Sequence, residues 1–113
     1  MMHILKLTAL AGMLAIAGCN TGASYDVGRE ALKGSPALRA DFVNNCTRNI
    51  ARKPIATQRA MAKLMNVSVR NTPRVYCQRV TRGVASGRLT NSDLSAGARG
   101  QLTPNVVRVL QGR

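Results

Sequence analysis

The placement of four prolines constrains the fold of this 113-residue chain more than any other feature. Proline lacks a backbone N–H and is tolerated at the first position of a helix, but it breaks a helix interior. Ser35-Pro36, Thr72-Pro73 and Thr103-Pro104 each place a hydroxyl suited to helix capping before such a proline. Lys53-Pro54 makes the same break without the cap. The prolines therefore predict where helices begin.

Apolar residues recur at helical spacing after each proline. The pattern predicts helices over about 36–52, 54–66 and 73–86, a short capped helix after Gly87, a loose stretch at 95–100 and a last short helix over 104–110. The side chains expected to point inward are Leu38, Phe42, Cys46 and Ile50 in the first helix, Ile55, Met61, Leu64 and Met65 in the second, and Tyr76, Cys77, Val80 and Val84 in the third.

The scarcity of aromatic residues favours the same fold class. With one Phe, two Tyr and no Trp, the core must be built from aliphatic side chains, whereas sheets are rich in β-branched and aromatic residues. The sequence predicts an all-α protein, with a small three- to four-helix domain that holds one disulfide and follows a flexible tether.

The first residues have the three parts of a secretory signal peptide. Residues 1–6 carry one lysine, residues 7–17 form an apolar run, and the small Gly18 precedes Cys19. A transmembrane helix needs about 20 apolar residues, and the polar Asn20 ends this run too early.

The segment Ile16-Ala17-Gly18-Cys19 resembles the lipobox of bacterial lipoproteins: an aliphatic residue, two small residues and the cysteine that is modified. The resemblance covers only the leader and its cleavage site. It implies a diacylglyceryl thioether and an N-acyl chain on Cys19, which together anchor a protein stably to a membrane. By the family's sorting rule, Asn20 after the cysteine implies the outer membrane, facing the periplasm. The alternative is an ordinary secretory signal that ends near a cysteine.

This leader suggests a division of the chain into three parts. Residues 1–18 are expected to be the signal peptide, residues 19–34 the lipidated cysteine and a glycine-containing flexible tether, and residues 35–113 the helical domain.

The cysteine count agrees with this division. Lipidation of Cys19 leaves Cys46 and Cys77, which are expected to form a disulfide in an oxidising compartment. Two buried free thiols are the alternative. A metal site is not expected, because the spacing is too wide and the single histidine, His3, lies in the leader.

The formal net charge of +13 points to anionic partners. Basic residues are spread over the three main predicted helices. The candidates for contact with a polyanion or a partner are Arg48, Arg52, Arg59, Lys63, Arg74 and Arg82. A merely solvated basic surface is the alternative, because no block of five or six charges appears.

Catalysis and cofactors are not expected. After removal of the leader the chain has no histidine, and its carboxylates are Asp26, Glu30, Asp41 and Asp93, so the usual general bases and nucleophile pairs are absent. The expected function is a lipid-anchored accessory protein that docks to an envelope protein. The alternatives are a module that binds phosphates of lipopolysaccharide or phospholipid, or an acidic polymer, and a small periplasmic stress chaperone. Nucleic acid is not an expected partner, since stacking aromatics are missing.

Overall fold

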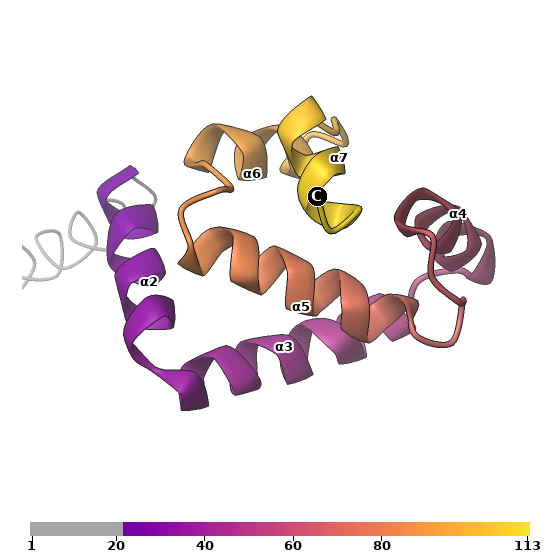
Figure 1. Ribbon diagram of the computed structural model, residues 1–113, viewed down its shortest axis with the longest axis horizontal. Coiled ribbons are helices and arrows are strands. Elements are labelled where there is room, and N and C mark those ends of the chain that lie inside the picture. The colour runs from indigo at the N-terminus through magenta and orange to yellow at the C-terminus, as the bar shows by residue number, and fades with distance from the viewer. Residues whose placement is uncertain (1–21) are drawn as a thin grey trace, which may run out of the picture.

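The computed structural model describes residues 22–113, in which every regular element is a helix (Figure 1). The helices are α2 (Gly22–Gly34), α3 (Pro36–Ala51), α4 (Ile55–Met65), α5 (Thr72–Ala85), α6 (Asn91–Ala98) and α7 (Pro104–Leu110). Residues 22–113 contain no strand, so the predicted all-α class is confirmed. None of these helices is long and apolar enough to cross a membrane. The predicted signal peptide and Cys19 lie outside the described residues.

Helix α5 lies at the centre and contacts α2, α3, α4 and α7. Figure 1 shows α3 running along one side of α5, with α6 and α7 on the opposite side. The Cys46–Cys77 disulfide joins α3 to α5 with a Cα–Cα distance of 5.7 Å, so the predicted pairing is confirmed. Cys77 is fully buried.

A compact aliphatic cluster forms beside α5. Leu32, Val84, Leu89 and Val109 are its buried members, and Tyr25, Val80, Ala85 and Val106 pack against it. Gly83 allows Leu89 to approach α5 closely, because a Cβ at Gly83 would lie 2.8 Å from Leu89 Cδ1. The glycine thus serves close packing rather than a turn.

The boundary expected for the flexible tether is wrong. Residues 22–34 form helix α2, so the helical domain already includes these residues and does not begin at residue 35. Leu32 of this helix is buried in the aliphatic cluster, and the Tyr25 hydroxyl donates a hydrogen bond to the carbonyl of Leu89. Tyr25 and Leu32 are seven residues apart and share one helix face. Burial of that face outweighs the conformational cost of Gly28.

The predicted helix starts at two prolines are confirmed in detail. The Ser35 hydroxyl accepts a hydrogen bond from the backbone N–H of Leu38, and the Thr103 hydroxyl accepts one from Val106. The expectation for Thr72 as a cap is wrong. Thr72 is the first residue inside α5, is buried, and donates its hydroxyl to the carbonyl of Ser68 at 2.9 Å.

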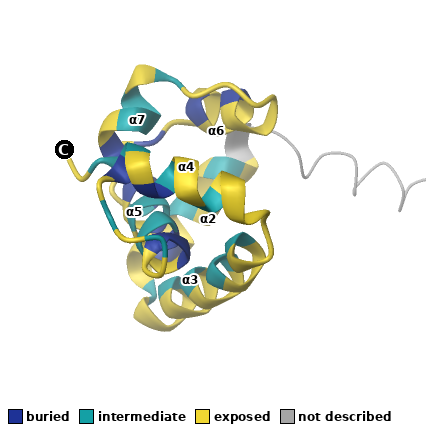
Figure 2. Cartoon of the chain, turned by 90° about the vertical axis from the view of Figure 1, so that its right-hand side faces the viewer, coloured by how far each residue is buried: buried dark blue, intermediate teal, exposed yellow. Residues whose placement is uncertain are grey.

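Two further expectations are corrected. Leu38 and Phe42 are not inward, because their exposed fractions are 39% and 46%; Ile55 is also exposed. Cys46 is bonded to α5, and Arg39 and Val43 line the groove between α3 and α5. Leu38 and Phe42 each come one residue before a groove residue, so their side chains are rotated by about 100° around the helix axis from it. Figure 2 shows the outer side of α3 as exposed. The stretch 95–100 is not wholly loose, since residues 95–98 continue α6.

Asp93 fastens α6 to the start of α7. It is buried, accepts hydrogen bonds from the Thr90 backbone N–H, the Thr103 hydroxyl and the Asn105 amide, and completes a capping box with Thr90. These donors, led by the backbone of Thr90, lower the pKa of Asp93 from 3.8 to about 2.

We expect this carboxylate to control acid stability. Because the pKa is lowered in the folded state, its stabilisation is complete above pH 3.8 and is lost as the pH falls toward 2. Asp93→Asn replaces one acceptor oxygen by an NH₂ group, which faces N–H or O–H donors of the neighbouring residues. We expect this change to lower the free energy of unfolding by about 1–3 kcal/mol. Thermal unfolding measured from pH 7 to pH 2 checks both points. A wild-type Tm that falls no more steeply than that of Asp93→Asn between pH 4 and pH 2 would contradict them.

Candidate functional site

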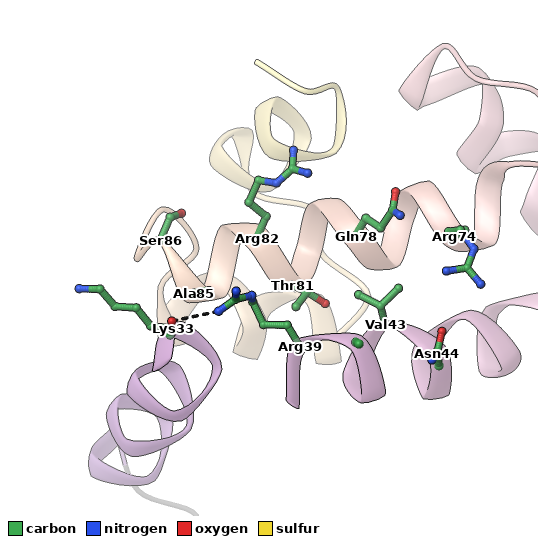
Figure 3. A pocket seen from close by; sticks show the side chains of 11 residues that line it. Lys33, Arg39, Val43, Asn44, Arg74, Gln78, Thr81, Arg82, Ala85 and Ser86 are labelled. Atoms are coloured by element: carbon green, nitrogen blue, oxygen red, sulfur yellow. Dashed lines mark hydrogen bonds between the residues drawn. The ribbon is translucent and has the colours of Figure 1, made fainter. Parts of the chain in front are cut away.

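A groove of about 620 Å³ lies between α3 and α5 (Figure 3). Its residues come from three helices and from the end of α5. They are Lys33 of α2, Arg39, Ala40, Val43 and Asn44 of α3, Arg74, Gln78, Thr81, Arg82 and Ala85 of α5, and Ser86. This volume lies within the range of roughly 300–1,000 Å³ that is usual for small-molecule sites.

The spacing of the residues along α5 explains why they form one wall. Arg74, Gln78, Thr81 and Ala85 are separated by four, three and four residues and therefore share a helix face. Ala40 of α3 and Ala85 of α5 have small side chains, which leave space between two helices that the disulfide holds together.

The walls of the groove are basic. Lys33, Arg39, Arg74 and Arg82 line it, and no Asp or Glu is among the lining residues. Arg74 extends from α5 toward α3, whereas Arg82 extends away from α3 (Figure 3). Arg82 also lines a second hollow beside Arg88 and Gly112. Arg39 and Arg74 are therefore the cations best placed to meet an anion within the groove.

Arg39 also holds the junction of α2 and α3. One nitrogen of its guanidinium, Nη1, donates to the carbonyls of Leu32 at 2.7 Å and Lys33 at 2.9 Å. These carbonyls belong to the last turn of α2, where a cation is favourable because the helix dipole is negative there. Arg39 thus contributes a positive charge to the groove and fixes one of its ends.

Thr81 is the unusual polar residue of the groove. Thr81 is only 3% exposed, and its hydroxyl oxygen is buried without a hydrogen-bond partner among the described residues. A buried hydroxyl without a partner costs about 1–3 kcal/mol. Figure 3 shows this side chain on the α3 side of α5, between Arg39 and Arg74.

The structure brings together only part of the set of basic residues predicted from the sequence. Arg74 and Arg82 line the groove, and the other four candidates are exposed elsewhere. Arg48 donates to Asn45 of its own helix, and Arg52 follows the end of α3. Arg59 and Lys63 lie on α4, which contributes nothing to the groove.

Sequence reasoning missed Lys33, Arg39 and Thr81 as residues of a site. Lys33 lies in the segment for which the sequence predicts a tether. The spacing of Tyr25 and Leu32 was the available signal that this segment is a helix. No sequence signal identifies Thr81, because its unpartnered state depends on how α3 packs against α5.

Other basic residues stabilise helix ends instead of facing a ligand. Nη1 of Arg79, a half-buried residue, donates to the carbonyl of Leu110 at 2.6 Å, at the end of α7. The same nitrogen lies 3.4 Å from the carbonyl of Met65, at the end of α4. Cations at helix C-termini are stabilising. Part of the large positive charge therefore has a structural use.

No carboxylate lines the groove, although Asp41 lies on α3, exposed. Asp26 and Glu30 lie 3.9 and 3.8 Å from Arg29 on α2, and Asp93 belongs to the α6–α7 junction. Within residues 22–113, no group of three or more metal-ligating side chains comes together. The groove has the donors needed to bind an anion.

Comparison of the chain with protein-family models, curated proteins and solved structures finds no significant match. The function must therefore be inferred from the sequence and from the geometry of this chain.

Proposed function

We propose that this chain is a lipid-anchored accessory protein of the bacterial envelope, and that its basic helical domain binds phosphates of lipopolysaccharide or phospholipid without catalysing a reaction. The groove between α3 and α5 carries the proposal, because four basic residues line it and no carboxylate does. Arginine pairs well with phosphate, since its planar guanidinium offers several N–H donors to the phosphate oxygens.

The anchor and the location are supported by the cysteines. Residues 16–19 resemble a lipobox, which requires a cysteine free for acylation. The Cys46–Cys77 disulfide uses the other two cysteines and leaves Cys19 for the lipid. Disulfides form and persist in oxidising compartments such as the periplasm. An anchor in the outer membrane, facing the periplasm, would hold the basic domain beside anionic headgroups.

Cell fractionation with salt washes tests the anchor and the binding together. The comparison is between the full chain and a form in which residues 20–113 follow the leader of an ordinary secreted protein. We expect the full chain to stay in washed membranes at high salt. The form without Cys19 should bind the same membranes at low salt and leave them as salt rises to about 1 M, where the Debye length is about 3 Å.

Each half of the proposal has its own contradicting result in this experiment. Release of the full chain by a salt wash would refute the anchor. Failure of the form without Cys19 to bind membranes even at low salt would refute phosphate binding by the domain. A neutral secreted protein carried through the same fractionation controls for trapping.

A further inference from the structure

Two independent observations concern the same part of the groove between α3 and α5, around Thr81. The first is the charge of the lining, with Arg39 and Arg74 on either side of Thr81 and no carboxylate present (Figure 3). The second is the Thr81 hydroxyl, which is buried, lies in the lining and has no hydrogen-bond partner within residues 22–113. A polar group in this state is rare in folded proteins and calls for a specific explanation.

We infer that the groove is a discrete binding site for a phosphate ester, in which the Thr81 hydroxyl and the Arg74 guanidinium donate hydrogen bonds to the phosphate. A phosphate ester would supply the acceptor that Thr81 lacks. This inference rests on the proposed phosphate-binding function, and it goes beyond that function by assigning one site, two ligand contacts and a ligand class.

The charge of the groove favours a phosphomonoester over a carboxylate. A phosphomonoester carries a charge of about −1.5 to −2 at neutral pH and three strong acceptor oxygens. Arg39, Arg74 and Thr81 together present more positive charge and more donors than a single carboxylate can satisfy. Arg39 already gives Nη1 to the end of α2, so its contribution is mainly its charge and its remaining N–H groups.

The rest of the lining indicates an organic part with hydroxyl groups. Asn44, Gln78 and Ser86 offer amide and hydroxyl groups of both hydrogen-bonding kinds, and Val43 gives an apolar surface. A volume of about 620 Å³ is far larger than inorganic phosphate needs. A sugar phosphate and the phosphorylated headgroup of a lipid share this chemistry.

Binding measurements on residues 20–113 test the site. This segment contains every described helix, the aliphatic cluster and the disulfide. The soluble probe is glucose 1-phosphate, with glucose as the uncharged control. The lipid probe is a vesicle of phosphatidylcholine with phosphatidic acid, compared with phosphatidylcholine alone. Calorimetry measures the soluble probes and sedimentation measures the vesicles.

Four variants separate the site from the general charge. Thr81→Val keeps the shape and removes the hydroxyl, and Thr81→Ser keeps the hydroxyl. Arg74→Gln removes a cation from the groove, and Arg59→Gln removes an exposed cation from α4, outside the groove. We expect Thr81→Val and Arg74→Gln to weaken binding about 10- to 100-fold, and Thr81→Ser and Arg59→Gln to leave the affinity within about twofold.

Thermal stability gives a readout that a merely structural role for Thr81 would not produce. Without ligand, Thr81→Val should raise Tm, because it removes a buried hydroxyl to which no described residue is hydrogen-bonded. With saturating probe, the wild-type Tm should rise more than that of Thr81→Val, since binding to the folded state stabilises it. A lower Tm for Thr81→Val without ligand would show that the hydroxyl is already satisfied, and would overturn the inference.

The outcomes distinguish this inference from the proposed function. Saturable binding of glucose 1-phosphate that depends on Thr81 and Arg74 supports the site and assigns it to free sugar phosphates. The same dependence seen only with phosphatidic acid vesicles supports the site and assigns it to a lipid headgroup. Vesicle binding that Arg74→Gln and Arg59→Gln weaken equally overturns the site and leaves the proposed function standing. Binding of glucose 1-phosphate without any binding to anionic membranes supports the site and refutes the proposed function.

Discussion

Replacing Cys46 and Cys77 together with alanine is expected to lower the free energy of unfolding by about 3.5–4 kcal/mol. The two cysteines are 31 residues apart, so the disulfide restricts a long loop of the unfolded chain. This loss is large for a small domain, whose total stability is typically about 5–15 kcal/mol. Urea unfolding of oxidised wild type and of the double variant, followed by circular dichroism, measures the difference.

Reduction provides the matched control. Wild type treated with a thiol reductant should approach the stability of the Cys46→Ala/Cys77→Ala variant, and the variant itself should not respond to the reductant. The two walls of the groove should also be held less firmly in place in the variant, because the disulfide joins the two helices that form them. Equal stability of oxidised wild type and the variant would show that the cross-link adds nothing to the fold.

Leu32→Ala is expected to cost about 2–5 kcal/mol, the range for removing a buried leucine side chain. Leu32 is 6% exposed and belongs to the aliphatic cluster with Val84, Leu89 and Val109. A tether residue would show no such effect, so this variant tests directly whether residues 22–34 belong to the folded domain. Urea unfolding measures the change.

Val27→Ala is the control on the same helix. Val27 is 70% exposed, and exposed substitutions of this kind usually change stability by less than about 0.5 kcal/mol. Similar small effects for Leu32→Ala and Val27→Ala would mean that α2 does not pack against the domain, and would restore the expectation of a tether. A loss of stability confined to Leu32→Ala agrees with the packing described above.

The helical class and most helix starts followed from the sequence because they depend on local chemistry, and the disulfide pair followed because both cysteines fall on apolar faces of predicted helices. Proline with a preceding Ser35 or Thr103 favours a helix start whatever packs nearby. Cys46 and Cys77 lie on the apolar faces of two helices, and the helices pack so that these positions meet. Thr72 is the exception, because its hydroxyl bonds to Ser68 in the preceding turn.

The sequence identified only some of the basic residues that come together in the groove. Net charge indicated an anionic partner, and two of the six candidate cations, Arg74 and Arg82, line the groove. The other four lie on exposed parts of α3, its C-terminal end and α4. Composition gives the sign of the charge, but only packing decides which cations share a concave surface.

The positions of most helices, the cysteine pairing and the excess of positive charge can be predicted from the amino-acid sequence alone. Tertiary structure decided which flank of each helix is buried, because periodicity defines an apolar stripe wider than the line of contact with a neighbouring helix. That choice exposes Leu38 and Phe42. It also buries Leu32 of a glycine-containing segment and leaves the Thr81 hydroxyl without a hydrogen-bond partner in the part of the chain that the structure describes. These features depend on contacts between residues far apart in the chain, which local propensity does not encode.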